Sequence, residues 1–127
     1  MIQYDNTTRM LEASLTLRSK RQDLLTSNIA NADTPHFRSS DLGFEGFLKN
    51  ATDVEALSSV KTAELIDSNG DVTEVEGPSD TLDGNAVDRD AEIGKSAENL
   101  QRFGVALETV RRKMGLLRYA ITGSDAA

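Results

Sequence analysis

Residues 93–121 read IGKSAENLQRFGVALETVRRKMGLLRYAI, and this stretch decides the fold. Apolar residues recur there every seven positions, in two interleaved rows. The first row comprises Ile93, Leu100, Leu107, Met114 and Ile121, and the second comprises Phe103, Val110 and Leu117, with Ser96 as its polar member. A stripe sustained over four heptads predicts a long helix with a narrow apolar seam that needs a partner helix.

The other end of the chain offers that partner. One face of a predicted helix there carries Leu11, Leu15, Leu25, Ile29 and Ala32. Arg18 and Gln22 interrupt this face. Met10, Leu17 and Leu24 form a second row with a spacing of seven. Either one broad stripe faces a single partner or the helix has two neighbours, and the sequence leaves both interpretations open.

Capping residues predict where the first helix begins and ends. It is expected to start between Asp5 and Thr8, whose side chains can accept hydrogen bonds from free amide groups. It is expected to reach about Asn31, because Pro35 disfavours helical backbone in the residue before it and has no amide proton to donate.

The second helix is expected to follow Asp83-Gly84-Asn85, with Asn85 or Asp88 as its cap and Gly123 as its stop. Its charges suit the helix dipole, with acidic residues in the first turn and basic residues near the far end. The acidic set is Asp88, Asp90 and Glu92, and the basic set is Arg111, Arg112, Lys113 and Arg118. Its internal glycines, Gly94, Gly104 and Gly115, suggest close approach of another helix, and tolerated weak points are the alternative.

Charge and composition separate the ends of the chain from its middle. Residues 33–83 contain three basic and twelve acidic side chains, a net charge of −9, whereas residues 1–32 and 84–127 each carry +1. An acidic chain without a basic stripe is a poor candidate for binding nucleic acid. The chain has no cysteine, and it shows neither a cleavable signal peptide nor a membrane-spanning stretch.

These patterns predict a mainly α fold in which two long antiparallel terminal helices form a coiled-coil-like hairpin. Residues 1–36 and 84–127 would form the α-helical core domain, and residues 37–83 an irregular insert with room for a small β-hairpin around residues 68–71. Near the start of the insert, an apolar cluster comprises Phe37, Leu42, Phe44, Phe47 and Leu48. This cluster either plugs the helix pair or anchors a neighbouring copy.

The sequence offers no constellation for chemistry. His36 is the only histidine, so neither a catalytic triad nor a site with several histidine ligands can form. Asp67–Asp71 resembles a calcium loop, but Val72 stands where that loop requires glycine. We therefore expect no enzyme, no cofactor, no metal and no small-molecule substrate.

Two polar motifs flank the insert. The first, which we call the elbow motif, comprises Asn28, Asn31, Asp33, Thr34, Pro35, Phe37, Arg38, Asp41 and Phe44. The second motif comprises Asp83, Gly84, Asn85, Val87 and Asp88. Together they resemble the flagellar basal-body rod proteins, and in particular the proximal rod type. The resemblance covers residues 9–48 and 83–121, and His36 stands where the family usually has glycine.

The resemblance implies a structural subunit of the periplasmic rod, exported by the flagellar type III apparatus without a cleaved signal. Its terminal helices would pack helically around a narrow channel and transmit torque. Its partners would be other copies, other rod proteins, and membrane-ring and export-gate proteins at the rod base. Two alternatives stay open, namely another flagellar axial protein, and a soluble coiled-coil adaptor or export chaperone.

Overall fold

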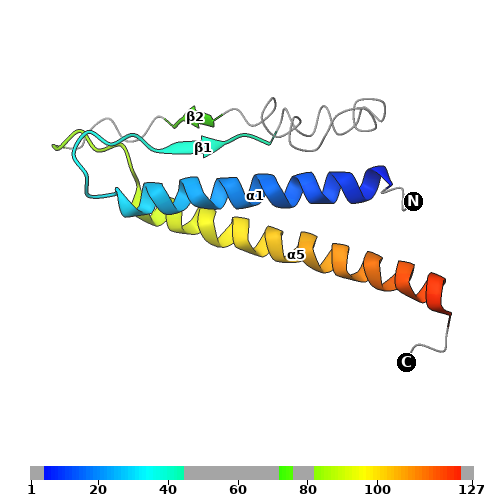
Figure 1. The fold of residues 1–127 in the computed structure, drawn as a ribbon. Coiled ribbons are helices and arrows are strands. Elements are labelled where there is room, and N and C mark those ends of the chain that lie inside the picture. Colours follow the sequence, from blue (N-terminus) through cyan, green and yellow to red (C-terminus); the bar gives the residue numbers. More distant parts are fainter. Residues whose placement is uncertain (1–4, 45–71, 76–81, 124–127) are drawn as a thin grey trace.

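The computed structural model describes residues 5–44, 72–75 and 82–123. In chain order the elements are helix α1 (Asn6–Ala30), strands β1 (Ser40–Leu42) and β2 (Val72–Glu74), and helix α5 (Arg89–Thr122). The two helices run antiparallel, and α1 lies between α5 and the β1–β2 pair (Figure 1). The prediction of a mainly α fold built on two long terminal helices is confirmed.

Side chains cap both helices where the sequence predicts. The Asp5 carboxylate accepts a hydrogen bond from the amide of Thr8 at 2.9 Å and so caps α1. The Asp88 carboxylate accepts from the amides of Asp90 and Ala91, the second and third residues of α5, at 3.1 and 3.2 Å. Gly123 follows the last residue of α5 with a φ of 71°, a left-handed conformation that glycine adopts without strain.

The apolar core lies between α1 and β1. Ala13, Leu17 and Leu42 are buried together, and Met10, Leu24 and Phe44 pack against them. The row formed by Met10, Leu17 and Leu24 therefore faces the strand, while other residues of α1 face α5. Of the two open interpretations, the one with two neighbours for this helix is confirmed. Leu42 and Phe44 act as a plug on the helix, and Phe47 and Leu48 lie outside the described residues.

The strand pair joins distant parts of the chain. β1 and β2 are antiparallel, with Ser40 opposite Glu74 and Leu42 opposite Val72. This differs from a local hairpin around residues 68–71, because the partner of Val72–Glu74 precedes it by about thirty residues. Long-range pairing of short strands leaves no turn signal between them, so the sequence pattern could not predict it. Residues 45–71, including the expected turn, lie outside the described part.

Candidate functional site: the elbow and the uncovered face of the second helix

Asn28 joins three elements at the end of α1. Its side chain is 2% exposed. The amide nitrogen donates to the Ser40 carbonyl at 2.8 Å and to Glu92 Oε2 at 2.7 Å, and the amide oxygen accepts from the Ser40 N–H at 3.1 Å. The side chain thus pairs with β1 as another strand would, and it also holds a buried carboxylate of α5. Lys95 supplies the second partner of that carboxylate at 2.7 Å.

Asn85, in the second motif, closes the end of α1 from outside the helix. It is 3% exposed, and its amide nitrogen lies 3.2, 2.6 and 2.9 Å from the carbonyl oxygens of Asn31, Ala32 and Thr34. Its amide oxygen accepts from the Val87 N–H at 2.8 Å. These carbonyls belong to the cap residue Asn31 and to the turn that follows α1, so a side chain from a distant segment holds the turn in which the helix ends. The two sequence motifs therefore meet in space.

Backbone contacts reinforce the junction of the two motifs. The His36 N–H donates to the Asp83 carbonyl at 3.2 Å, and the Ala86 N–H donates to the Phe37 carbonyl at 3.1 Å. His36 has a φ of 61°, and Gly84 has a φ of 68°. A Cβ on Gly84 would lie 2.7 Å from the His36 imidazole, so a side chain cannot be added there without a shift.

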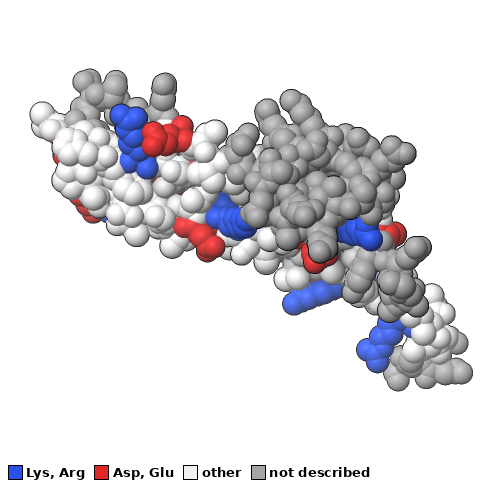
Figure 2. Space-filling view, turned by 45° about the horizontal axis from the view of Figure 1, so that its top comes forward, with Lys and Arg blue, Asp and Glu red and all other residues white. Residues whose placement is uncertain are grey.

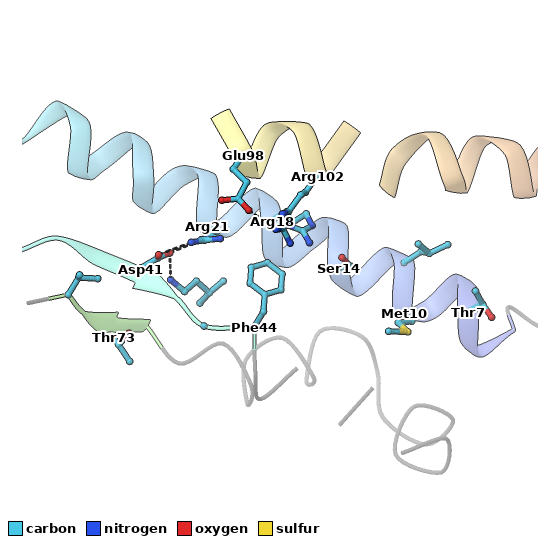
Figure 3. Close-up of a pocket in the computed structure, with 14 residues that line it drawn as sticks. Thr7, Met10, Ser14, Arg18, Arg21, Asp41, Phe44, Thr73, Glu98 and Arg102 are labelled. Carbon is cyan, nitrogen blue, oxygen red and sulfur yellow. Dashed lines mark hydrogen bonds and ion pairs between the residues drawn. The ribbon is translucent and has the colours of Figure 1, made fainter. Parts of the chain in front are cut away.

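The charged residues of the elbow motif form ion pairs. Arg21 on α1 donates to both carboxylate oxygens of Asp41 at 2.7 and 2.8 Å (Figure 3). Burial acts to raise the pKa of Asp41, but the hydrogen bonds from Arg21 and the Leu42 N–H, together with the charges of Arg21 and Lys95, outweigh burial and hold the pKa below its usual value. The more exposed pairs of the motif are Arg38 with Glu74 at 3.4 Å and Asp33 with Arg89 at 2.5 Å.

Phe44 carries two arginines on its ring. The guanidinium carbons of Arg18 and Arg21 lie 4.8 and 5.9 Å from the ring centroid, within the range of cation–π attraction (Figure 3). Burial lowers the pKa of Arg18, and the nearby charges of Arg102 and Arg21 lower it further. Phe44 therefore anchors the segment that follows β1 on α1.

The seam between the helices is polar over its elbow half, which the sequence analysis missed. Gln22 Nε2 donates to Ser96 Oγ at 2.7 Å. Asn99, only 1% exposed, donates to Gln22 Oε1 at 3.0 Å and to the Arg18 carbonyl at 2.9 Å. The sequence did contain a signal for this polar contact. Gln22 interrupts the apolar face of the first helix and Ser96 interrupts the second apolar row, and these two side chains face each other. Glu92 and Asn99 occupy buried positions of α5 for the same reason.

These polar contacts turn α5 about its axis, so its first apolar row does not lie against α1. Of that row, Leu107 is half-buried, and Ile93, Leu100, Met114 and Ile121 are 49%, 54%, 39% and 77% exposed. In the second row, Phe103 and Val110 are half-buried and Leu117 is 43% exposed. On α1, Leu25 is buried, and Leu11, Leu15 and Ile29 are half-buried. The first row is therefore exposed at four of its five positions and forms an uncovered face, whereas Leu107, Phe103 and Val110 are partly buried.

One further contact fastens the start of α1 to α5. Lys113 Nζ lies 2.6 Å from both carboxylate oxygens of Asp5. The hydrogen bond from Lys113, with those from Thr8, lowers the pKa of Asp5 from 3.8 to about 2. Beyond Lys113, α5 extends for nine residues with Leu116, Tyr119 and Ile121 largely exposed, and Figure 1 shows the helices diverging toward this end.

The arrangement offers contacts rather than a reaction centre. Across residues 5–44, 72–75 and 82–123, no group of three or more His, Asp or Glu side chains could hold a metal ion. In the same ranges, neither helix contains a segment long and apolar enough to span a membrane. The polar residues of the two motifs hold α1, β1 and α5 together, and the uncovered face of α5 is available to other molecules.

Comparison with known proteins assigns the chain to a family. The family described as "Flagella basal body rod protein" matches residues 11–38, which include most of α1 and the elbow motif as far as Arg38. The flagellar basal body rod protein FlgB of Aeromonas hydrophila is 33% identical over 130 residues, covering 98% of each chain. The chain belongs to the FlgB family of flagellar basal-body rod proteins. The FlgB of Cereibacter sphaeroides is 35% identical over 117 residues, covering 87% of this chain and 89% of the relative. The FlgB of Escherichia coli K12 is 32% identical over 118 residues, covering 84% of this chain and 86% of the relative.

Membership of the FlgB family gives the site a context. The protein belongs to a family of structural components of the basal-body rod, and this family is not a class of enzymes. The two motifs that carried the resemblance form one hydrogen-bonded junction, in which Asn28 and Asn85 are the buried members. The family resemblance and the physical junction therefore rest on the same residues.

Proposed function

We propose that this chain assembles helically into the proximal rod through its terminal helices, so that many shallow helix contacts transmit torque and the assembly lines an export channel. The observation that carries the proposal is the uncovered apolar row of α5, Ile93, Leu100, Leu107, Met114 and Ile121. Four of these five side chains are exposed, and apolar side chains that gather on one exposed helix face mark a surface that another protein covers.

The division of the chain supports the same proposal. Residues 1–36 and 84–127 would pack among neighbouring subunits, with residues 37–83 as an insert that is tied to α1 through Leu42 and the Arg21–Asp41 pair. The core of a single copy is small, with four buried apolar side chains among the described residues. Ordering each residue costs about 1–2 kcal/mol of backbone entropy, so neighbouring copies would supply the burial that one copy lacks.

Partners and route follow from the rod context. The partners would be other copies, other rod proteins, and the membrane-ring and export-gate proteins at the rod base. The chain would travel through the flagellar type III apparatus without a cleaved signal. Its function would be non-enzymatic, and neither nucleic acid nor a small-molecule substrate would take part.

A pair of matched substitutions tests the proposed assembly surface. Leu100→Asp places a charge on the uncovered row, and Val105→Asp places the same charge at a similarly exposed position outside both rows. Each variant would replace the natural copy in the source cell, and motility and the subunit content of purified basal bodies would be measured. We expect Leu100→Asp to abolish incorporation and Val105→Asp to retain it. Normal incorporation of Leu100→Asp would exclude the row as an assembly surface.

Leu107→Asp extends the test along the same row. Leu107 is half-buried, so this variant also requires a check of folding by circular dichroism. We expect a folded chain that fails to assemble and leaves the cell non-motile. A motile cell carrying Leu107→Asp would contradict the assignment of this row.

A further inference from the structure

Most charged side chains of α5 have an ion-pair partner within the chain. The pairs are Arg89–Asp33, Glu92–Lys95, Glu98–Arg102, Glu108–Arg112 and Lys113–Asp5. Asp90, Arg111 and Arg118 are exposed and make no ion pair with the residues that the structure describes. Unpaired charges that remain on a helix whose other charges are paired are candidates for contacts outside the chain.

The three unpaired charges lie on one face of α5. Asp90, Ala97, Gly104, Arg111 and Arg118 follow one another at intervals of seven, next to the apolar row that begins at Ile93. This face is acidic at its start, has small residues in the middle and is basic at its end. Nothing lies within 4 Å of the position that a Cβ on Gly104 would take, so the middle is open to a second helix. Figure 2 shows basic side chains near the end of α5, at the lower right.

The two ends of this face cannot meet within one chain. Asp90 and Arg111 are 21 residues apart on a single helix, which separates them by about 32 Å at a rise of 1.5 Å per residue. Their opposite charges and adjacent apolar side chains can therefore pair only between molecules. The electrostatic complementarity of the two halves favours a second copy as the occupant.

Resting on the proposed rod function, we propose that the tail half of this face in one copy docks on the head half in the next, parallel and staggered by 21 residues. The stagger places Arg111 opposite Asp90, Met114 opposite Ile93, and Ile121 opposite Leu100 of the neighbouring copy. It brings exposed apolar residues together and pairs Arg111 with Asp90 in the same register, while Arg118 lies opposite Ala97. Ala97 and Gly104 leave room beside the contact because their side chains are small.

Such a contact propagates without closing. The two docking surfaces differ, so each copy keeps one free head half and one free tail half. Two successive steps advance the chain by about 63 Å, whereas the 34 residues of α5 span about 51 Å, so alternate copies do not overlap. An antiparallel dimer would also pair Asp90 with Arg111, but it is closed and places Leu100 against Leu100. An open contact is the one that an elongating structure requires.

Cysteine cross-linking distinguishes the two arrangements, because the natural chain has no cysteine. Cells producing Leu100→Cys and Ile121→Cys chains together would be oxidised mildly, and their basal bodies purified and analysed on non-reducing gels. We expect a disulfide between one chain of each kind, at a yield several times that of Val105→Cys with Ile121→Cys. Dimers between two Leu100→Cys chains, or no excess over the Val105→Cys control, would overturn the staggered contact.

Charge reversal in the same cross-linking background tests the register. We expect Arg111→Asp to reduce the cross-link severalfold, and the added change Asp90→Arg to restore it. Arg112→Asp is the matched control, because Arg112 pairs with Glu108 away from this face, and it should leave the yield unchanged. Equal yields in all variants would refute the pairing of Asp90 with Arg111.

The two proposals fail in different ways. Basal bodies that contain the chain but lack the cross-link would refute the staggered contact and leave the rod function standing. Basal bodies that never contain the chain would refute the rod function, and the staggered contact with it.

Discussion

Replacing Asn28 by aspartate tests the junction that the structure places at the end of α1. The amide nitrogen of Asn28 lies 2.7 Å from Glu92 Oε2 and 2.8 Å from the Ser40 carbonyl. Asn28→Asp keeps the size of the side chain but turns this donor into an acceptor. Two carboxylates and a carbonyl oxygen would then face one another in a site where Asn28 and Glu92 are 2% and 3% exposed.

The expected cost follows from proton uptake. The folded variant can relieve the repulsion by protonating the introduced carboxyl group, which raises the pKa of that group above its unfolded value. Protonating a carboxyl with an ordinary pKa near 4 costs about 4 kcal/mol at pH 7, since each unit is worth about 1.4 kcal/mol. The folded variant then binds more protons than the unfolded chain, so its stability rises as the pH falls, and the cost at pH 5 is about 1.4 kcal/mol.

Urea unfolding followed by circular dichroism at pH 7 and pH 5 measures the effect. Asn31→Asp is the control, because the Asn31 side chain is less buried and donates only to a carbonyl of its own helix at 2.8 Å. We expect a loss of about 1 kcal/mol or less from the control at both pH values. A cost for Asn28→Asp that matches the control, or that does not shrink at pH 5, would refute the reasoning.

Three further substitutions probe other contacts. Lys113→Met should raise the pKa of Asp5 from about 2 toward 3.8, which an NMR titration would measure. The Asp5 contribution to stability, which the wild type loses as the pH falls from 3.8 toward 2, would then be smaller in the variant. An unchanged pKa would show that Lys113 is not the cause. Arg21→Lys keeps the charge, but a lysine cannot donate to both oxygens of Asp41 as the guanidinium does. Urea unfolding should therefore show a free energy of unfolding lower by about 1–2 kcal/mol, and an unchanged value would contradict the bidentate pair. His36→Gly should stabilise the chain by about 1 kcal/mol in the same assay, because His36 has a φ of 61° and glycine adopts this conformation without strain. A loss of stability would mean that the imidazole beside Gly84 contributes more free energy than the backbone strain costs.

Local signals predicted the elements of this protein closely. Asp5, Asp88 and Gly123 marked helix ends correctly because a cap depends on residues within one turn of it. The second row of the first helix, with Leu17 at its centre, left a second neighbour open, and the structure shows that this neighbour is β1. The roles of the two motifs in assembly stay predictions, although their residues lie together in the structure.

The direction in which α5 faces could not be predicted from its apolar period. A heptad pattern shows that a stripe will be covered, but it does not name the molecule that covers it. Gln22 and Asn99 decide the matter, because their hydrogen bond fixes the rotation of α5 against α1. Their pairing links residues 77 positions apart, and no local spacing reveals it.

The sequence alone determined the two helices, their ends, the concentration of acidic residues between them and the family of the protein, because these depend on neighbouring residues and on patterns that a reader can count. The tertiary structure decided which side of each helix meets the other. Buried amide N–H groups must find hydrogen-bond acceptors, and supplying acceptors to the side-chain nitrogens of Asn28, Asn85 and Asn99 in one arrangement turned most of the apolar row of α5 outward.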